Sequence, residues 1–425
     1  MPSSRRSDGV LTLGSVSLSD VARDPRAGTP TYVYDLDGIA AEAVELRAAF
    51  DDAPHLVAYA VKANSAGPIV KTLAAGGCGA DVVSGAELTL ALACGMAAAR
   101  IVFSGVAKTD AELDLAIGVG DSGISAIQVE SVEELPRISA RAAAARRVAR
   151  VSLRINPAIE IEALDTHRHI ATGHDEAKFG VPLASVTDAL SVLDGDRNLR
   201  LVGVGAHVGS QLTATDGYLA SARALFTFAR EVRARFELAF VDAGGGFGID
   251  YGEGCAVRPA DFMRSTRKLQ REMGLDDLAL YCEPGRSLVG AHGVLVARVI
   301  QRKIAEPRRW LMIDAGMNDL MRPALYQARH RIIPVVDAGA PVRSYRVVGP
   351  VCESSDDFGV HDLPDGKLGE VAILDAGAYG YSMASRYNGR ALPAEVFLRG
   401  GKIVASTERG SVDEWVQDRL RAALL

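Results

Sequence analysis

A single lysine follows directly on an apolar run. Leu56–Val61 is apolar, Lys62 comes next, and Ala63-Asn64 leads into turn-forming residues. This pattern predicts a buried parallel strand that carries an amine to the open end of a barrel or sheet. Burial disfavours the charged form of an amine and makes it a nucleophile that can form a Schiff base. The alternative is a lysine whose charged end reaches solvent from the end of the strand.

Other polar groups stand at the ends of apolar runs in the same way. Asp81, His207 and Glu283 lie in or directly after three such runs, and Ser210 and Arg286 follow shortly afterwards. A carboxylate such as Glu283 is costly to bury unpaired, but it is balanced when it faces the protonated ring nitrogen of a pyridine, which makes the ring an electron sink. His207 is either a hydrogen-bonded core residue or a ring that stacks on a flat cofactor. Together these residues predict a site for a phosphorylated cofactor.

A glycine triplet follows the apolar run Leu238–Asp242. Gly244–Gly246 can bring backbone N–H groups close to an anion, because no Cβ atom blocks the approach. Ser210 can add a hydroxyl donor and Arg286 a guanidinium. The alternative is a tight turn between a strand and a helix.

Repeated strand–helix units must position these groups. Residues 30–290 alternate between short apolar runs and amphipathic stretches, which predicts a (β/α)8 barrel, also called a TIM barrel, with its active site at the C-terminal ends of the strands. A doubly wound open sheet is the alternative, weakened because no G-x-G-x-x-G follows the first strand. The candidate strands are Thr31–Tyr34, Leu56–Val61, Gly79–Val83, Ile101–Phe103, Ala126–Val129, Val151–Ile155, Leu201–His207, Leu238–Asp242 and Leu280–Glu283. The candidate helices include Ala86–Ala93, Asp110–Ile117, Ser131–Ala145 and Tyr218–Arg235.

After residue 290 the sequence no longer alternates between strands and helices and instead suggests strands linked by turns. Residues 291–425, joined by N-terminal residues 1–29, predict a mainly antiparallel, β-barrel-like domain, with a further strand at residues 10–13. Gly400-Gly401 between Glu395–Arg399 and Lys402–Ser406 indicates a two-residue hairpin. The other candidate strands are Val294–Ile300, Trp310–Ile313, Arg331–Pro334, Ser344–Val348 and Val371–Leu374.

Composition narrows the class of protein. The chain has 425 residues, 48% hydrophobic content and a net charge of −6, which favour a globular protein of two domains and argue against a nucleic-acid partner. The 5 cysteines are scattered and never form C-x-x-C, so we expect no disulfide scaffold, no metal site and a reducing compartment. The sequence has neither a signal peptide nor a run of 18 apolar residues. We therefore expect a cytoplasmic protein with no membrane partner.

Longer motifs give the chain a family resemblance. It resembles the fold-type III pyridoxal-phosphate decarboxylases (ornithine, lysine and arginine decarboxylase class 2), and among them most closely the bacterial diaminopimelate decarboxylases. The motifs are YAVKAN (59–64), GADVVSGAEL (79–88), HVGSQ (207–211), GGGFG (244–248), EPGRS (283–287), MNDLMRPALY (317–326), CESSD (352–356) and GAYGYSMAS (377–385).

The resemblance implies a role for each matching residue. Lys62 forms the Schiff base with pyridoxal 5'-phosphate, His207 stacks on the ring, Glu283 binds the ring nitrogen and Cys352 donates a proton. The other implied cofactor-binding residues are Asp81, Ser210, Gly244, Gly245, Gly246, Gly285, Arg286 and Tyr379. The implied substrate-binding residues are Arg286, Arg322, Tyr326, Glu353 and Tyr379.

The implied reaction converts meso-2,6-diaminopimelate into L-lysine and CO2, the last step of lysine biosynthesis. The residue types agree with this reaction, because the substrate has a second amino-acid head far from the reacting carbon. Arg322 and Arg286 can pair with the carboxylate of that head, and Glu353 with its ammonium group. On residue type alone, Arg322 could instead be a surface arginine and Cys352 a small buried residue. The resemblance also implies a homodimer with shared active sites, in which the Cys352–Glu353 loop reaches the partner's cofactor.

Two departures from the family pattern leave the substrate open. Ser385–Asn388 is S-R-Y-N where the family usually has S-N-Y-N, and Ser84–Glu87 is S-G-A-E in place of S-G-G-E. A related decarboxylase of ornithine, arginine or a carrier-tethered acidic amino acid is the alternative. An alanine racemase would place arginine where Glu283 stands. A non-catalytic homologue would lack Lys62, Cys352 or the phosphate ligands.

Overall fold

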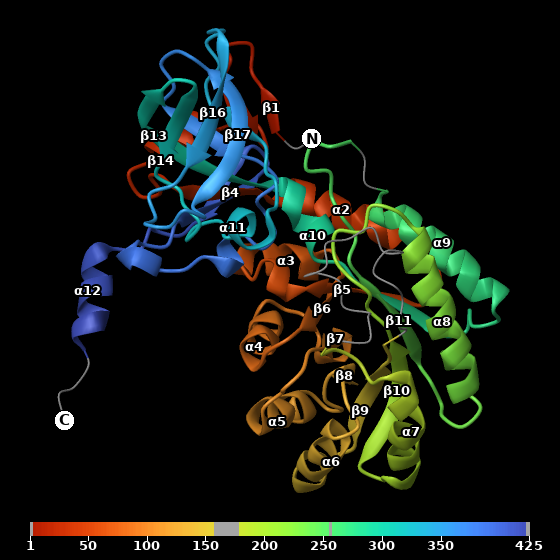
Figure 1. The fold of residues 1–425 in the computed structure, drawn as a ribbon. Helices are drawn as coiled ribbons and strands as arrows, with labels where there is room; N and C mark the ends of the chain where they lie inside the picture. Colours follow the sequence, from red (N-terminus) through yellow and green to blue (C-terminus); the bar gives the residue numbers. More distant parts are fainter. Residues whose placement is uncertain (1–2, 157–177, 255–256, 422–425) are drawn as a thin grey trace. The chain divides into compact units, whose positions relative to one another are not determined.

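The computed structural model describes residues 3–156, 178–254 and 257–421. The chain forms two compact units (Figure 1). The barrel unit comprises Ala40–Ile249 and Cys255–Ser287. The β unit comprises Met1–Ile39, Asp250–Gly254 and Leu288–Leu425.

Parallel strands form the centre of the barrel unit. They close into a barrel in the order β10-β11-β12-β5-β6-β7-β8-β9, which confirms the predicted (β/α)8 barrel and excludes the open sheet. The strands are almost entirely buried, as expected for parallel strands covered by helices. Their bounds are β5 (His55–Ala60), β6 (Gly79–Val82), β7 (Ile101–Phe103), β8 (Ala126–Val129), β9 (Ala149–Arg154), β10 (Leu199–Gly205), β11 (Phe240–Gly245) and β12 (Ala279–Glu283).

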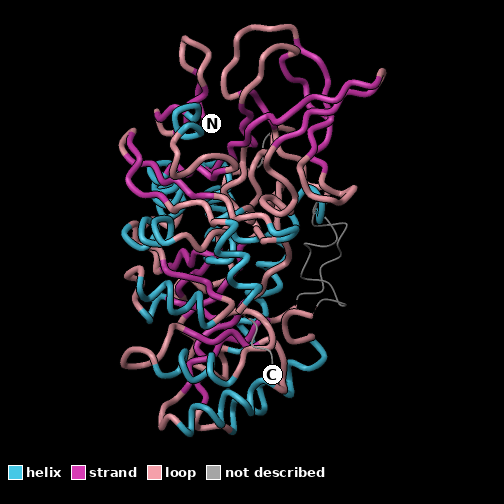
Figure 2. Tube along the Cα trace, turned by 90° about the vertical axis from the view of Figure 1, so that its left-hand side faces the viewer, coloured by secondary structure: helices cyan, strands magenta, loops and turns pink. Residues whose placement is uncertain are grey.

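Helices lie outside these strands (Figures 1 and 2). α8 buries Leu225, Phe226 and Ala229 and exposes Arg223 and Arg230, so one face packs on the barrel. The helices are α2 (Leu36–Ala48), α3 (Gly67–Ala75), α4 (Gly85–Ala93), α5 (Asp110–Gly118), α6 (Glu134–Ala144), α7 (Val186–Gly195), α8 (Asp216–Val232) and α9 (Pro259–Glu272). The short 3-10 helices are η1 (Val61–Ala63), η2 (Ala98–Arg100) and η5 (Leu183–Ser185).

The β unit is built on a mainly antiparallel sheet. Its path is β17-β16-β14-β13-β4-β19-β20, with β18 joining β13 and β15; only the β14–β16 and β19–β4 pairs within it are parallel among the described strands. The strands are β4 (Thr31–Asp35), β13 (Gly293–Ala305), β14 (Arg308–Ile313), β15 (Ile332–Pro334), β16 (Val342–Val348), β17 (Asp357–Pro364), β18 (Glu370–Ile373), β19 (Ala394–Arg399) and β20 (Lys402–Ser406).

Smaller elements complete this unit. β1 (Ser3–Arg5), β2 (Leu11–Leu13) and β3 (Val16–Ser17) form a three-stranded sheet. The helices are α1 (Leu18–Arg23), α10 (Arg286–Val289), α11 (Arg322–Tyr326) and α12 (Val412–Leu420), with the 3-10 turns η6 (Gly290–His292), η7 (Tyr381–Met383) and η8 (Tyr387–Gly389). α10 begins in the barrel unit and ends in the β unit.

One strand differs from the sequence-based expectation. Thr31–Asp35 forms a strand, but it pairs with β13 and β19 in the β unit rather than lying in the barrel, which closes with eight other strands. The strand predicted at residues 10–13 lies in the β unit, as expected: β2 pairs with β1 and β3, and Val10 bridges Val336 just after β15. The predicted hairpin is confirmed: Gly400 and Gly401 have φ of 56° and 72° and connect β19 to β20.

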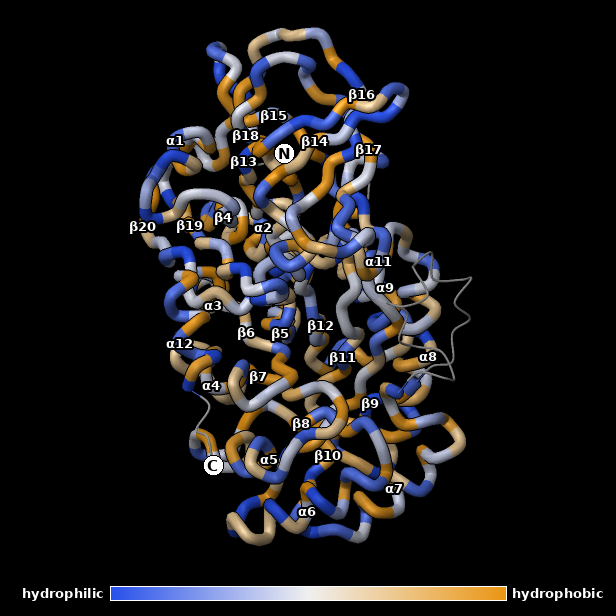
Figure 3. Tube along the Cα trace, turned by 60° about the vertical axis from the view of Figure 1, so that its left-hand side comes forward, coloured by the Kyte–Doolittle hydropathy of each residue, from blue (hydrophilic) through white to orange (hydrophobic). Residues whose placement is uncertain are grey.

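Apolar side chains converge inside each unit, and apolar stretches follow the strands in Figure 3. The rings of Phe240 and Tyr281 stack at 4.1 Å between centroids in the barrel unit. In the β unit, Val33, Val294 and Val396 belong to one buried cluster. In the part of the chain that the structure describes, every helix is too short or too polar to cross a membrane.

Candidate active site

Lys62 lies in the 3-10 turn that directly follows β5. The parallel register pairs Ala60 with Asp81, so the two strand ends bring Lys62 beside that carboxylate. The Nζ atom of Lys62 is 2.7 Å from Oδ2 of the fully buried Asp81. The lysine side chain is 38% exposed, so the predicted buried amine is instead partly accessible and ion-paired. It sits at the strand end where a barrel active site is expected.

Glu283 ends β12 and belongs to a group of buried carboxyls. Burial raises the pKa of Glu283 well above its ordinary value, and the charges of Asp242 and Asp81 act in the same direction. Burial also raises the pKa of Asp242 to about 6. Lys62 opposes the rise at Glu283 by favouring its charged form. A cation placed against Glu283 would offset the cost of its ionisation, and a protonated pyridine nitrogen is such a cation.

His207 follows β10 and has a defined protonation pattern. The N–H of Gly245 donates to Nδ1 of His207 over 3.1 Å, so a neutral ring carries its proton on Nε2. Burial lowers the pKa of His207 well below its ordinary value, and the charges of Arg154 and Lys62 lower it further. Nδ1 lies 4.0 Å from Oε2 of Glu283. A neutral, flat imidazole beside Glu283 fits a residue that stacks on a cofactor ring.

The glycine triplet Gly244–Gly246 packs closely against its neighbours. A Cβ atom on Gly245 would lie 1.9 Å from the carbonyl oxygen of Glu283, so only glycine allows this approach of β11 to β12. Two of its N–H groups already have partners: Gly244 donates to Asp242 over 2.9 Å and Gly245 donates to His207. Within the triplet, the N–H groups of Gly244 and Gly245 are therefore engaged inside the protein. Close packing and orientation of His207 are what Gly244 and Gly245 supply.

Arg286 and Ser210 form a pair of donors that could hold a phosphate. Nη2 of Arg286, at the start of α10, donates to Oγ of Ser210 over 2.9 Å. Both groups donate hydrogen bonds, and arginine recognises phosphate through its planar fork. An amine at Lys62, a flat ring at His207, a carboxyl at Glu283 and this donor pair match the aldehyde, ring, ring nitrogen and phosphate of pyridoxal phosphate.

The β unit carries the predicted proton donor and its neighbour. Cys352 is exposed, so the alternative of a small buried residue is wrong. The N–H of Cys352 donates to Oδ1 of Asn388 over 3.0 Å, and the hydroxyl of Tyr387 donates to Oε1 of Glu353 over 2.6 Å. The S-R-Y-N motif therefore holds the Cys352–Glu353 loop, a contact between two motifs that the sequence did not predict.

A buried aspartate holds the same loop from its other end. Asp356 accepts hydrogen bonds from the N–H of Val351 over 2.6 Å and of Met317 over 2.7 Å. Arg386, the residue that departs from the family motif, pairs with Asp418 of α12 over 3.2 Å. This pair is partly exposed, so we expect it to contribute little to stability.

Arg322 begins α11 and is only 5% exposed, so the alternative of a surface arginine is wrong. Tyr326 ends the same helix, and Tyr379 follows β18 with a left-handed φ of 55°. The β unit thus contains Arg322, Tyr326, Cys352, Glu353 and Tyr379. The barrel unit contains the other predicted site residues: Lys62, Asp81, His207, Ser210, Gly244, Gly245, Gly246, Glu283, Gly285 and Arg286.

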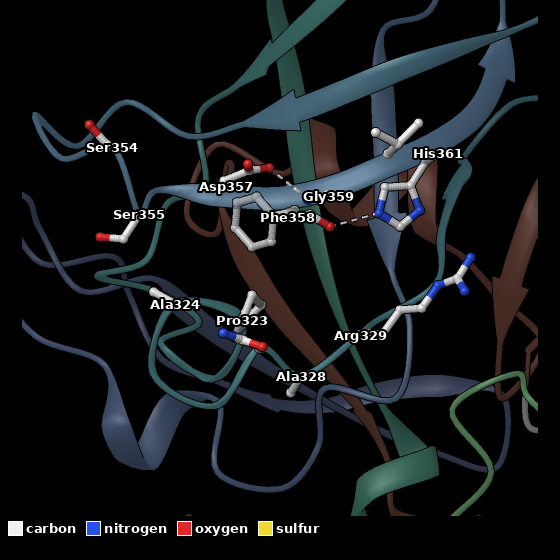
Figure 4. Close-up of a pocket in the computed structure, with 12 residues that line it drawn as sticks. Pro323, Ala324, Ala328, Arg329, Ser354, Ser355, Asp357, Phe358, Gly359 and His361 are labelled. Carbon is white, nitrogen blue, oxygen red and sulfur yellow. Dashed lines mark hydrogen bonds between the residues drawn. The ribbon is translucent and has the colours of Figure 1, made fainter.

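The β unit also has a pocket of about 590 Å³ (Figure 4). Its lining includes Pro323 and Ser354, which directly follow Arg322 and Glu353, together with Arg329, Asp357 and His361. Among the described lining residues there is no predicted catalytic, cofactor or substrate residue. The pocket therefore adjoins the segments that carry Arg322 and Glu353, and its described lining is separate from the predicted site residues.

Known proteins share this architecture and these motifs. Residues 36–290 match the family model of the pyridoxal-dependent decarboxylase pyridoxal-binding domain. The chain is 39% identical over 411 residues to the diaminopimelate decarboxylase of Pseudomonas fluorescens, covering 96% of both chains. It is 37% identical over 395 residues to that of Neisseria meningitidis serogroup A, covering 92% of this chain and 95% of the relative.

A solved structure agrees with these relatives. The diaminopimelate decarboxylase of M. jannaschii in co-complex with L-lysine superposes with a TM-score of 0.90 at 33% identity, covering 99% of this chain and 98% of that one. Barrel, motifs and relatives lead to one conclusion: the chain belongs to the diaminopimelate decarboxylase family of pyridoxal-phosphate-dependent decarboxylases.

Proposed function

We propose that this chain decarboxylates meso-2,6-diaminopimelate to L-lysine and CO2 with pyridoxal 5'-phosphate, as the last step of lysine biosynthesis. The observation that carries the proposal is the rim that joins Lys62 to Asp81 and sets His207 beside the buried Glu283. This is the donor and acceptor set that pyridoxal phosphate requires. When bound, the cofactor supplies a ring that accepts the electron pair left behind by CO2.

The residues of the barrel unit hold and tune the cofactor. Lys62 provides the attachment point, and Asp81 orients its amine. Glu283 keeps the ring nitrogen protonated, because a cation there lowers the cost of ionising this buried carboxyl. His207 covers one ring face. The phosphate is bound by Ser210, Arg286 and the backbone at Gly246 and Gly285, together with Tyr379 of the β unit.

The residues of the β unit select and protonate the substrate. Arg322, with Arg286, pairs with the carboxylate of the distal amino-acid head, and Glu353 pairs with its ammonium group. Tyr326 and Tyr379 complete that contact. Cys352 returns a proton to the carbon that loses CO2. Its exposure on a loop supports this role, because a proton donor must reach the substrate.

We also propose a cytoplasmic homodimer in which the β unit and N-terminal residues contribute substrate and interface residues. In that assembly the Cys352–Glu353 loop serves the partner's cofactor. The support is the family resemblance and the exposure of Cys352. Arg386 is engaged by Asp418, so the departure in the S-R-Y-N motif gives no specific support to an ornithine, arginine or carrier-bound substrate.

The test is CO2 release by the purified, cofactor-loaded protein with meso-diaminopimelate, ornithine, arginine and glutamate in parallel. We expect release from diaminopimelate alone, with stoichiometric lysine. Release from ornithine or arginine at an equal or greater kcat/KM would overturn the substrate assignment. Release from none of the four, with the cofactor bound, would overturn it in favour of a specialised substrate.

A further inference from the structure

Two aromatic side chains contact the guanidinium group of Arg322. Nη1 of Arg322 lies 2.7 Å from Nε2 of His330, and its Cζ atom lies 4.8 Å from the ring centroid of Tyr251. The Tyr251 and His330 rings meet edge to face, with centroids 5.2 Å apart. His330 is 1% exposed and Arg322 5%, so both are buried within the β unit, whereas Tyr251 is half-buried. The function assigned above to Arg322 makes no use of either ring.

The protonation pattern of His330 follows from its partners. A guanidinium only donates hydrogen bonds, so Nε2 of His330 is the acceptor. The proton of the neutral ring therefore lies on Nδ1, which donates to the carbonyl oxygen of Leu374 over 2.9 Å. The N–H of Leu374 in turn donates to the carbonyl oxygen of Arg331 over 2.9 Å, which extends the β15–β18 pair by one step. The sheet thus fixes the direction in which His330 presents its acceptor.

The segment that carries Tyr251 is fixed as well. Oδ1 of Asp250 accepts hydrogen bonds from the N–H groups of Gly252, Glu253 and Gly254 at 2.7, 3.0 and 3.2 Å, which close a tight turn. These bonds, with that of Gly252 foremost, lower the pKa of Asp250. A Cβ atom on Gly252 would lie 2.6 Å from Cδ of Arg331, whose guanidinium pairs with Asp375 over 2.6 Å.

We propose that Tyr251 and His330 are positioning residues that hold the Arg322 guanidinium in the plane required for the distal carboxylate, and so set the preference for a substrate with a carboxylate at its far end. The proposal rests on the substrate role proposed above for Arg322. Bidentate pairing depends on the orientation of the guanidinium plane, which a hydrogen bond at one nitrogen and a ring against one face both restrict.

The experiment compares two ligands that differ by that carboxylate. L-Lysine keeps the distal carboxylate of diaminopimelate, whereas 1,5-diaminopentane lacks it. Inhibition constants for both are measured on wild type, His330→Leu, His330→Gln, Tyr251→Leu and Tyr251→Phe, with kcat and KM for diaminopimelate and the cofactor absorbance. The glutamine carbonyl can accept from Arg322 in place of Nε2, and phenylalanine keeps the ring face, so these two are the matched conservative variants.

We expect His330→Leu and Tyr251→Leu to weaken the binding of L-lysine about 10- to 100-fold, the range found when the hydrogen-bonding partner of a metal-binding side chain is removed. The binding of 1,5-diaminopentane should weaken less than about 3-fold. KM should rise more than kcat falls, and the two conservative variants should recover most of the loss. Equal weakening of both ligands, or unchanged L-lysine binding, would overturn the positioning role. A wild type that does not prefer L-lysine over 1,5-diaminopentane would overturn the underlying role of Arg322 instead.

Discussion

The barrel unit and the β unit position their functional groups by different means. In the barrel unit the backbone positions the groups: Lys62 follows β5, Asp81 lies in the adjacent β6, and Glu283 ends β12. In the β unit, side chains position them. Asn388 and Tyr387 hold Cys352 and Glu353 through hydrogen bonds between loops. Strand ends give a rigid rim for the chemistry that the family shares, whereas loops tied by side chains can vary with the substrate.

Individual buried carboxyls can be compared in the same way. In the barrel unit, Glu283 and Asp242 lie near the cations Lys62 and Arg154. In the β unit, burial raises the pKa of Glu395 to about 7, and Tyr34 acts in the opposite direction through a hydrogen bond. A buried carboxyl beside cations can take part in charge stabilisation, whereas one held by a neutral partner acts on stability alone. Substitutions in each unit separate these two cases.

The largest effect is expected at the attachment point. Lys62→Ala should lower kcat by more than about 10³-fold, because it removes the covalent step. The long-wavelength absorbance of lysine-attached cofactor should disappear with it. Lys71→Ala, which alters an exposed lysine of α3, serves as the control and should change neither quantity. Retention of that absorbance by Lys62→Ala would remove Lys62 from the site.

Glu283→Gln should have the second-largest effect. The amide cannot stabilise a protonated ring nitrogen, so we expect kcat to fall by about 10²- to 10³-fold, comparable to the loss of one preorganised electrostatic group. The readouts are single-turnover rates and the absorbance spectrum. The cofactor should remain attached, because Lys62 is untouched. A loss below about 3-fold would mean that Glu283 does not face the ring nitrogen.

Cys352→Ala tests the loop of the β unit. Removal of a general acid is expected to lower kcat by about 10²-fold while cofactor absorbance is unchanged. Cys94→Ala, a partly buried cysteine of the barrel unit, is the matched control and should behave as wild type. Unchanged turnover of Cys352→Ala would assign the proton transfer to another group.

Glu395→Gln should affect stability alone, and only at higher pH. The ordinary carboxyl pKa of 4.5 is raised to about 7 in the fold. Between these values the folded state keeps a proton that the unfolded chain releases, so wild-type stability falls as pH rises from about 4.5 to 7. The glutamine variant has no such loss. Thermal unfolding at pH 5 and pH 8 should show the variant gaining roughly 1–3 kcal/mol relative to wild type.

An exposed glutamate provides the control for that experiment. Glu272→Gln at the end of α9 should track wild type at both pH values. A difference between Glu395→Gln and wild type that does not change with pH would contradict the assigned pKa. Loss of activity in Glu395→Gln would contradict the view that this carboxyl acts on stability alone.

The sequence predicted the barrel unit more completely than the β unit. The barrel strands and the residues at their ends were predictable, because parallel strands buried on both faces leave continuous apolar runs before each polar group. β17 was missed because its sequence, Asp357–Pro364, mixes polar and apolar residues. The strand Thr31–Asp35 was found but assigned to the barrel, since a local pattern does not say which strands will pair with it.

Contacts within the sites could not be predicted from the sequence, because they depend on the tertiary structure. The N–H groups of Gly244 and Gly245 look available in sequence, and only the fold reveals that Asp242 and His207 accept from them. Tyr251 and His330 lie far apart in the sequence and carry no motif of their own. The contact of Tyr251 with Arg322 arises because the segment Asp250–Gly254 belongs to the β unit although its neighbours in sequence belong to the barrel unit.

The proposed homodimer, in which the Cys352–Glu353 loop serves the partner's cofactor, can be tested directly. The direct measurement is the diaminopimelate decarboxylase activity of Lys62→Ala and Cys352→Ala chains, each alone and co-expressed. Random pairing gives half hybrid dimers with one intact site of two, so co-expression should restore about one quarter of wild-type activity. Activity no greater than that of the separate variants, in dimers shown to contain both chains, would contradict the shared site.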